Sequence, residues 1–175
     1  KKIDQKTFFE TDIFLVITPM SSHFAESADT FLEAFSKAEL EILKRWVQAG
    51  GRLLVFSEHY PFDVAVSGLL ETFGITTSIG VTIDKVFSGN SDGNIIFEAD
   101  RLDASHPIVS GKRQVNKLAS YGGSALKGSE YTNVLRLSKH STNASRNWAG
   151  VDGGPIGSGN SQGLVGLFGK GRLAA

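Results

Sequence analysis

The sequence predicts an α/β fold built on a parallel, helix-covered sheet, and residues 12–74 carry the observations behind this prediction. The run 12–18 is β-branched and apolar between polar ends, which is typical of a strand buried on both faces of a parallel sheet. A second apolar run, 52–57, follows, and a helical pattern comes after each run. This alternation indicates βαβ units, in which helices connect parallel strands.

The first helix is predicted from its ends and its apolar face. Ser36 and Glu39 form a capping box, in which each side chain satisfies a free backbone donor of the first turn. Apolar residues then recur every three to four positions up to Val47, which gives the helix one apolar face. Glycine is favoured just past a helix C-terminus, so Gly50-Gly51 ends it. A second helix is expected over 62–73.

The second half of the chain predicts short strands in place of helices. Their expected ranges are 75–83, 95–98, 115–120 and 134–137. Residues 138–163 are rich in Ser, Asn and Gly and have few apolar anchors, which predicts a long mobile loop. Residues 163–168 and 172–175 are expected to pair as an antiparallel hairpin.

Composition excludes several classes of function. The 175 residues are in the size range of one domain, and 18 Lys and Arg balance 18 Asp and Glu. Nucleic acids and anionic membranes attract a basic excess, so neither is an expected partner. The chain has no cysteine, which excludes thiolate metal sites and a cysteine nucleophile. Its apolar runs are far shorter than the roughly 20 residues that span a bilayer.

Three further patterns fail on their context, so they identify neither a cofactor nor a metal site, and the cofactor is left open. Residues 159–163 match the G-x-S-x-G nucleophile elbow, but an elbow needs a strand before it and a helix after it. The glycines of 154–159 lack the flanking strand and helix that would aim backbone donors at a phosphate. The four histidines show no metal-ligand spacing.

The candidate site lies where the second predicted strand ends, at residues 57–60. Ligands of open α/β sheets bind outside the carboxyl ends of the strands. Glu58 and His59 are the predicted catalytic residues, because a carboxylate and an imidazole there can act as acid, base or metal ligand. Ser57 and Tyr60 are predicted to bind the ligand. Helix capping alone is the alternative, since Glu58 also suits a helix N-terminus.

Three more ligand-binding residues are predicted at a distance in the sequence. Ser22 and His23 follow the first strand, whose end should lie beside that of the second. His106 is the third candidate, although His106-Pro107 is also typical of a structural turn.

The segment 35–56, together with the turn 58–62, resembles the class I glutamine amidotransferase-like superfamily, and within it an uncharacterised bacterial branch that lacks the catalytic cysteine. That branch has a helix ending in Gly-Gly, a buried strand and an Asp-His-x-Pro-Phe-like turn, where Glu58 replaces the aspartate here. Shorter matches at 69–75, 102–108 and 168–172 extend the resemblance over 12–175.

The resemblance implies an α/β, flavodoxin-like three-layer sandwich with a mainly parallel central sheet and a C-terminal antiparallel hairpin. True amidotransferases carry their nucleophilic cysteine at this turn, so no glutaminase activity is expected here. Related sugar-utilisation proteins carry a histidine at about this place, which His59 matches. The family pattern also includes a strand before Asp12 and an acidic segment after Ala175, so 1–175 is expected to be a single domain truncated at both ends.

Three functions follow as hypotheses. The first is an amidotransferase-like domain that binds a small polar ligand, with carbohydrate as one candidate, in the cleft at the strand ends. The second is a hydrolase that uses Glu58 and His59 as an acid–base pair or in a metal-assisted site. The third is a non-catalytic module that contacts a protein partner or a second copy through 138–163. The lack of cysteine does not fix the compartment, and an exported or periplasmic location is slightly favoured over a cytoplasmic one.

Overall fold

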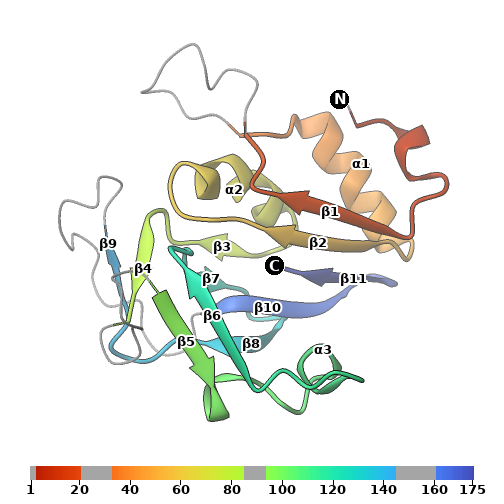
Figure 1. Ribbon diagram of the computed structural model, residues 1–175. Coiled ribbons are helices and arrows are strands. Elements are labelled where there is room, and N and C mark those ends of the chain that lie inside the picture. The colour runs from red at the N-terminus through yellow and green to blue at the C-terminus, as the bar shows by residue number, and fades with distance from the viewer. Residues whose placement is uncertain (1–2, 21–32, 85–93, 145–160) are drawn as a thin grey trace.

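The computed structural model describes residues 3–20, 33–84, 94–144 and 161–175 (Figure 1). Its main sheet has seven strands in the order β1-β2-β11-β10-β7-β3, with β8 also paired to β10. The strands of this sheet are β1 (Ile13–Ile17), β2 (Arg52–Phe56), β3 (Thr76–Thr77), β7 (Leu126–Lys127), β8 (Thr132–Arg136), β10 (Ser161–Phe168) and β11 (Gly171–Ala174). Two smaller pairs are β4 (Val81–Ile83) with β9 (Thr142–Ala144) and β5 (Asn94–Glu98) with β6 (Lys117–Tyr121).

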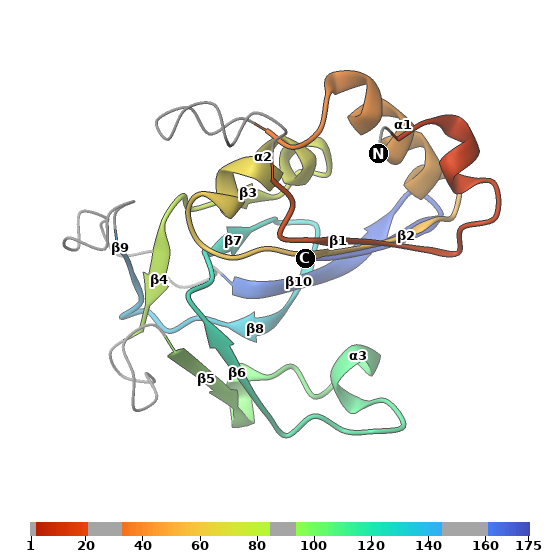
Figure 2. The same ribbon diagram turned by 45° about the horizontal axis from the view of Figure 1, so that its top comes forward.

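The described helices are few and short. They are α1 (Lys37–Gln48), α2 (Phe62–Thr72), α3 (Pro107–Ser110) and the 3₁₀ turns η1 (Gln5–Phe8) and η2 (Ala99–Arg101). None of these helices is long and apolar enough to cross a membrane. The two longer ones, α1 and α2, lie on the same face of the main sheet (Figures 1 and 2).

The main sheet is mixed, so the expected flavodoxin-like three-layer sandwich with a mainly parallel sheet is wrong. Only the β1–β2 and β2–β11 pairs are parallel. β10 pairs antiparallel with β11, β7 and β8, and β3 pairs antiparallel with β7. Each parallel pair needs a crossover of a dozen or more residues, usually a helix. After α2 the described chain contains short strands and the four-residue α3, and no longer helix. The described strands that follow α2 therefore pair antiparallel, apart from β11 with β2.

The helix α1 forms as its sequence predicts. Ser36 Oγ accepts from the Glu39 backbone N–H at 3.4 Å, and Glu39 Oε2 accepts from the Ser36 N–H at 2.9 Å, which completes the capping box. Leu43 and Val47 are fully buried between α1 and the sheet. The chain leaves the helix through Gly50, whose φ of 128° favours glycine.

The strand β1 is buried on one face only, which corrects the prediction of burial on both. Val16 is 4% exposed and belongs to the core beneath the helices, whereas Ile13, Leu15 and Ile17 are 54%, 53% and 64% exposed. Alternate side chains of a strand point to opposite faces. The second face of the sheet is therefore open along β1, because no described helix covers it there.

A second core covers another part of that face. It lies between the β5–β6 pair, α3 and the strands β8 and β10, and its buried members include Ile95, Phe97 and Val165. The β5–β6 pair lies in front of β8 and β10 in Figure 1 and below them in Figure 2, on the side away from α1 and α2. The helix face and the second face thus carry separate apolar clusters.

The segment 138–163 is only partly the loop that was predicted. Thr142–Ala144 forms β9 against β4, and Asn143 Nδ2 donates to the Ile79 carbonyl at 2.8 Å. Ser161 begins β10, which forms the expected C-terminal hairpin with β11. Composition misses these strands because long-range pairing orders their polar residues. Residues 145–160 lie outside the described part of the chain.

Candidate functional site

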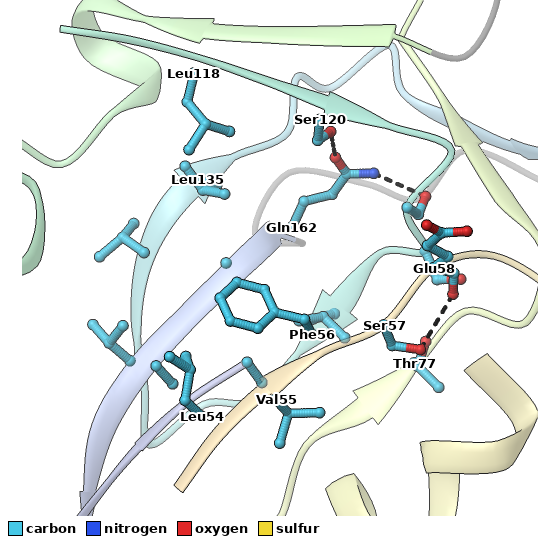
Figure 3. Close-up of a pocket in the computed structure, with 18 of the residues that line it drawn as sticks. Leu54, Val55, Phe56, Ser57, Glu58, Thr77, Leu118, Ser120, Leu135 and Gln162 are labelled. Atoms are coloured by element: carbon cyan, nitrogen blue, oxygen red, sulfur yellow. Dashed lines mark hydrogen bonds between the residues drawn. The ribbon is translucent and has the colours of Figure 1, made fainter. Parts of the chain in front are cut away.

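A cavity of about 640 Å³ lies between β2, β10 and β11 of the main sheet and β6 and α3, and residues 63, 66 and 70 of α2 also border it. Its volume is in the range of small-molecule pockets. Most of its wall is apolar, and representative apolar residues are Leu54, Phe56, Val109, Leu118, Leu135 and Val165. Polar residues gather at one end, where Ser57, Glu58, Thr77, Ser120 and Gln162 lie near one another (Figure 3).

The polar end is built where the two parallel strands β1 and β2 finish together. Ile17 pairs with Phe56 in register, and the Thr18 N–H donates to the Phe56 carbonyl at 2.9 Å. Thr18, Ser57 and Glu58 all line the cavity. The sequence prediction that the ends of the first two strands meet is confirmed, because parallel pairing brings both carboxyl ends to one edge.

Glu58 and His59 take different positions around this end. Glu58 is exposed and lines the cavity, and its backbone carbonyl accepts from Ser57 Oγ at 3.4 Å. His59 is half-buried, and its Nδ1 lies 2.6 Å from the Tyr60 carbonyl oxygen. A carbonyl oxygen only accepts, so Nδ1 carries the proton. Among the described residues, no hydrogen bond joins Glu58 to His59, and the imidazole is not part of the cavity wall.

The remaining predicted site residues are not gathered at the cavity. Tyr60 supplies the carbonyl that His59 contacts and is half-buried outside the wall. His106 caps α3, since its Nδ1 accepts from the Ile108 N–H at 3.2 Å. Ile108, not His106, lines the cavity. Residues 22 and 23, the predicted ligand-binding Ser and His after β1, lie outside the described residues.

Gln162 is a cavity residue that sequence analysis missed. Its Oε1 accepts from Ser120 Oγ, and its Nε2 donates to the Gly123 carbonyl at 2.8 Å, which fixes the orientation of the amide (Figure 3). A primary amide has two donor hydrogens and two acceptor lone pairs, so one of each stays available to a ligand. The Gly-rich surroundings of Gln162 gave no period-two signal that would have placed it on a strand.

The neighbouring serine explains why the G-x-S-x-G match is not an elbow. Ser161 is fully buried, and its Oγ donates to the Leu135 carbonyl at 2.8 Å and accepts from the Gly163 N–H at 2.9 Å. A strand, β10, follows this serine where an elbow would have a helix. Its hydroxyl is therefore a structural group.

Asp63 is a second residue that the sequence analysis did not single out. It is fully buried in the first turn of α2, where Oδ1 accepts from the Val64 N–H at 2.7 Å. Oδ2 accepts from the Gly80 N–H at 2.7 Å and from Ser124 Oγ at 3.0 Å. Burial raises the pKa of the Asp63 carboxyl above its usual value, while these hydrogen bonds and the His59 charge oppose the rise. The carboxylate ties α2 to the segments before β4 and after β6.

Comparisons with known proteins reveal likeness of fold. No protein-family model and no curated protein sequence matches the chain. Among solved structures, the mmIFT52 N-terminal domain is similar with a TM-score of 0.63 and 18% identity, over 99% of this chain and 68% of that one. A ThuA-like protein from Bacteroides uniformis is similar with a TM-score of 0.50 and 11% identity, over 97% of this chain and 60% of that one. The chain thus spans roughly two thirds of the length of these structures.

Proposed function

We propose that this chain is a small-molecule-binding domain whose cavity takes an amphipathic ligand. The observation that carries the proposal is the division of the cavity into an apolar body and a polar end with a fixed amide (Figure 3). An apolar wall with a few placed polar groups is the usual design of ligand sites, because apolar burial supplies affinity and the polar groups set orientation. The apolar part of the ligand would lie against Leu54, Leu118 and Leu135.

This proposal replaces the small polar ligand expected from the sequence with an amphipathic one. A sugar presents hydroxyl groups over most of its surface, and a mostly apolar wall would leave many of them without partners. Ser57 and Gln162 supply a hydroxyl and an amide at one end of the cavity (Figure 3). We therefore expect the polar part of the ligand to be confined to one end.

Binding without catalysis is favoured over hydrolysis by the geometry at residues 57–60. A hydrolase with Glu58 and His59 as its acid–base pair needs both side chains within reach of the same substrate atom. Glu58 lines the cavity, whereas the His59 ring contacts its own turn through Tyr60. The interaction module through 138–163 stays a prediction, because residues 145–160 are not described.

We further propose that the chain is a divergent member of the class I amidotransferase-like superfamily. The order of the motifs in the sequence supports this membership, and so does the fold likeness to a ThuA-like protein. The absence of cysteine from the chain means that this proposal does not include glutamine hydrolysis by a cysteine nucleophile.

Three probes with one apolar body test the proposed function: 4-phenylbutan-1-ol, 4-phenylbutylamine and 4-phenylbutyrate. We expect at least one of them to bind the wild type, measured by calorimetry and by thermal unfolding. A ligand present at about 100 times its Kd stabilises the folded state by about 2.7 kcal/mol. Absence of binding by all three would overturn the proposal.

A matched pair of variants locates the binding. Ala174 lines the cavity from β11, so Ala174→Phe should fill part of it and weaken binding at least about tenfold, about 1.4 kcal/mol. Ala104 is exposed and outside the wall, so Ala104→Phe is the control and should bind like the wild type. Circular dichroism checks that both variants are folded. Equal binding by wild type and a folded Ala174→Phe would place the ligand elsewhere and contradict the proposal.

A further inference from the structure

We propose that the ligand of this cavity is an organic ammonium ion, with its positive charge at the polar end and an apolar body in the rest of the cavity. The inference rests on the proposed function and adds the charge of the ligand to it. Three observations support it: the absence of Lys and Arg from the described wall, the Glu58 carboxylate, which has no partner among the described residues, and the aromatic rings that line the cavity.

The charged residues of the described cavity wall are all acidic. They are Glu58 and Asp63, and no Lys or Arg of the described chain lines the cavity. The whole sequence has equal numbers of basic and acidic residues, so this one-sided charge is a property of the site. Asp63 is fully buried and its carboxylate oxygens accept from Val64, Gly80 and Ser124, so Glu58 is the acidic group that a ligand would meet. A ligand carboxylate or phosphate would meet this like charge and no Lys or Arg of the described wall, whereas an ammonium group would meet opposite charge.

Three other acidic residues have a charge partner, whereas Glu58 has none among the described residues. Asp84 pairs with a buried arginine at 3.2 Å, Glu98 with Lys117 at 3.4 Å and Asp103 with Arg136 at 3.4 Å. No hydrogen bond or ion pair among the described residues uses the Glu58 carboxylate. Glu58 is exposed and lines the cavity, so its charge is available to a ligand that enters the polar end.

Aromatic side chains also line this cavity. Phe56 and Tyr121 both line the cavity and are 53% and 62% exposed, so a ligand can reach both rings. The end of β6 lies against the 57–60 turn, because a Cβ on Gly122 would come within 2.8 Å of His59 Cδ2. An aromatic face attracts an ammonium ion through its quadrupole and at the same time packs against apolar groups.

The three phenylbutyl probes separate this inference from the proposed function, because they share one body and differ in charge. We expect 4-phenylbutylamine to bind wild type about five- to tenfold more tightly than 4-phenylbutan-1-ol, from an exposed ion pair and a cation–π contact. We expect 4-phenylbutyrate to bind most weakly. The advantage of the amine should shrink as NaCl rises from 20 to 500 mM, because salt screens exposed charges.

Two variants assign the effect to one carboxylate. Glu58→Gln should remove most of the amine's advantage and leave the affinity for the alcohol unchanged. Glu71→Gln is the matched control, because Glu71 is exposed on α2 and outside the cavity wall, and it should bind all three probes like wild type. Equal affinities of wild type for the amine and the alcohol, or a preference for the carboxylate, would overturn the charge assignment and leave the proposed function standing. Failure of all three probes to bind would overturn both.

Discussion

Ser120 Oγ donates a hydrogen bond to the Oε1 of Gln162, and this contact joins β6 to β10 across the polar end of the cavity. The same amide donates to the Gly123 carbonyl at 2.8 Å. The two strands belong to different sheets, so the side chain of Gln162 links these sheets at the polar end of the cavity.

Removal of the Gln162 amide should lower the stability of the fold. Gln162→Leu keeps the side-chain size but breaks two hydrogen bonds, and we expect the free energy of unfolding to fall by about 1–3 kcal/mol. Ser120→Ala breaks one of the two bonds and should cost about half as much. Urea denaturation measures both variants. An unchanged stability of Gln162→Leu would show that the amide does not hold β6 to β10.

The contribution of Asp63 to the free energy of unfolding should fall as pH rises. Burial raises the pKa of its carboxyl in the folded state above the ordinary value of 3.8, so the folded protein binds this proton more tightly than the unfolded chain does. Its contribution is therefore fully present below about pH 3.8 and is lost as pH rises through the raised folded pKa. The difference in unfolding free energy, wild type minus Asp63→Asn, should decrease between pH 3.5 and pH 7.

This difference isolates Asp63 from the other carboxyls. The pKa values of Asp4 and Asp103 are lowered by hydrogen bonds from Thr7 and Ser105, so these groups add stability as pH rises in both proteins. Their effects cancel in the subtraction. A difference that grows with pH would contradict the raised pKa of Asp63.

Arg101 and Asp84 form a buried ion pair, and substitution of one partner alone should strongly lower the free energy of unfolding. Arg101 also donates to the carbonyls of Ile96 and Arg136 and lies 4.9 Å from the ring centroid of Phe97. Loss of one partner leaves a buried charge without its counter-ion, so Arg101→Met should lower the free energy of unfolding by about 3–5 kcal/mol. Chemical denaturation measures this change.

The double variant of this pair gives the sharper result. Asp84→Asn together with Arg101→Met removes both charges, and we expect it to be less destabilised than the sum of the two single variants. Additive effects would mean that the pair contributes no coupling energy.

The two faces of the sheet should respond differently to the same substitution. Leu53→Ala removes a side chain that is 2% exposed beneath the helices, and we expect a loss of about 2–5 kcal/mol. Leu15→Ala removes one that is 53% exposed on the open face, and we expect a change within about 0.5 kcal/mol. Thermal unfolding at low protein concentration compares them. A large loss for Leu15→Ala would indicate that this face is covered in solution.

Local patterns in the sequence predicted the first part of the fold well, for reasons that can be traced to single residues. The Ser36–Glu39 capping box, the apolar spacing up to Val47 and the glycine at 50 each act within one or two helical turns. The hairpin of β10 and β11 depends on a short turn in the same way. The meeting of Thr18 with the end of β2 followed from parallel pairing of two strands joined by one helix.

The candidate site was predicted only in part. Ser57 and Glu58 line the cavity, but Gln162 and Asp63 could not be placed there in advance. Their partners are far away in the sequence: Gln162 contacts Ser120, and Asp63 contacts Gly80. The periodicity of apolar residues along the sequence reports on neighbouring positions and does not reveal contacts between distant ones.

By itself the sequence determined the strand–helix–strand–helix start, the charge balance and the absence of cysteine chemistry, because these depend on composition or on contacts within a few residues. Only the tertiary structure decided that the sheet is mixed, that β1 has an open apolar face and that β5–β6 covers a cavity on that side. An apolar strand residue such as Leu15 has the same local preference whether a helix, a second sheet or solvent lies over it. What lies over it is settled by segments that meet in space after long separations in the chain.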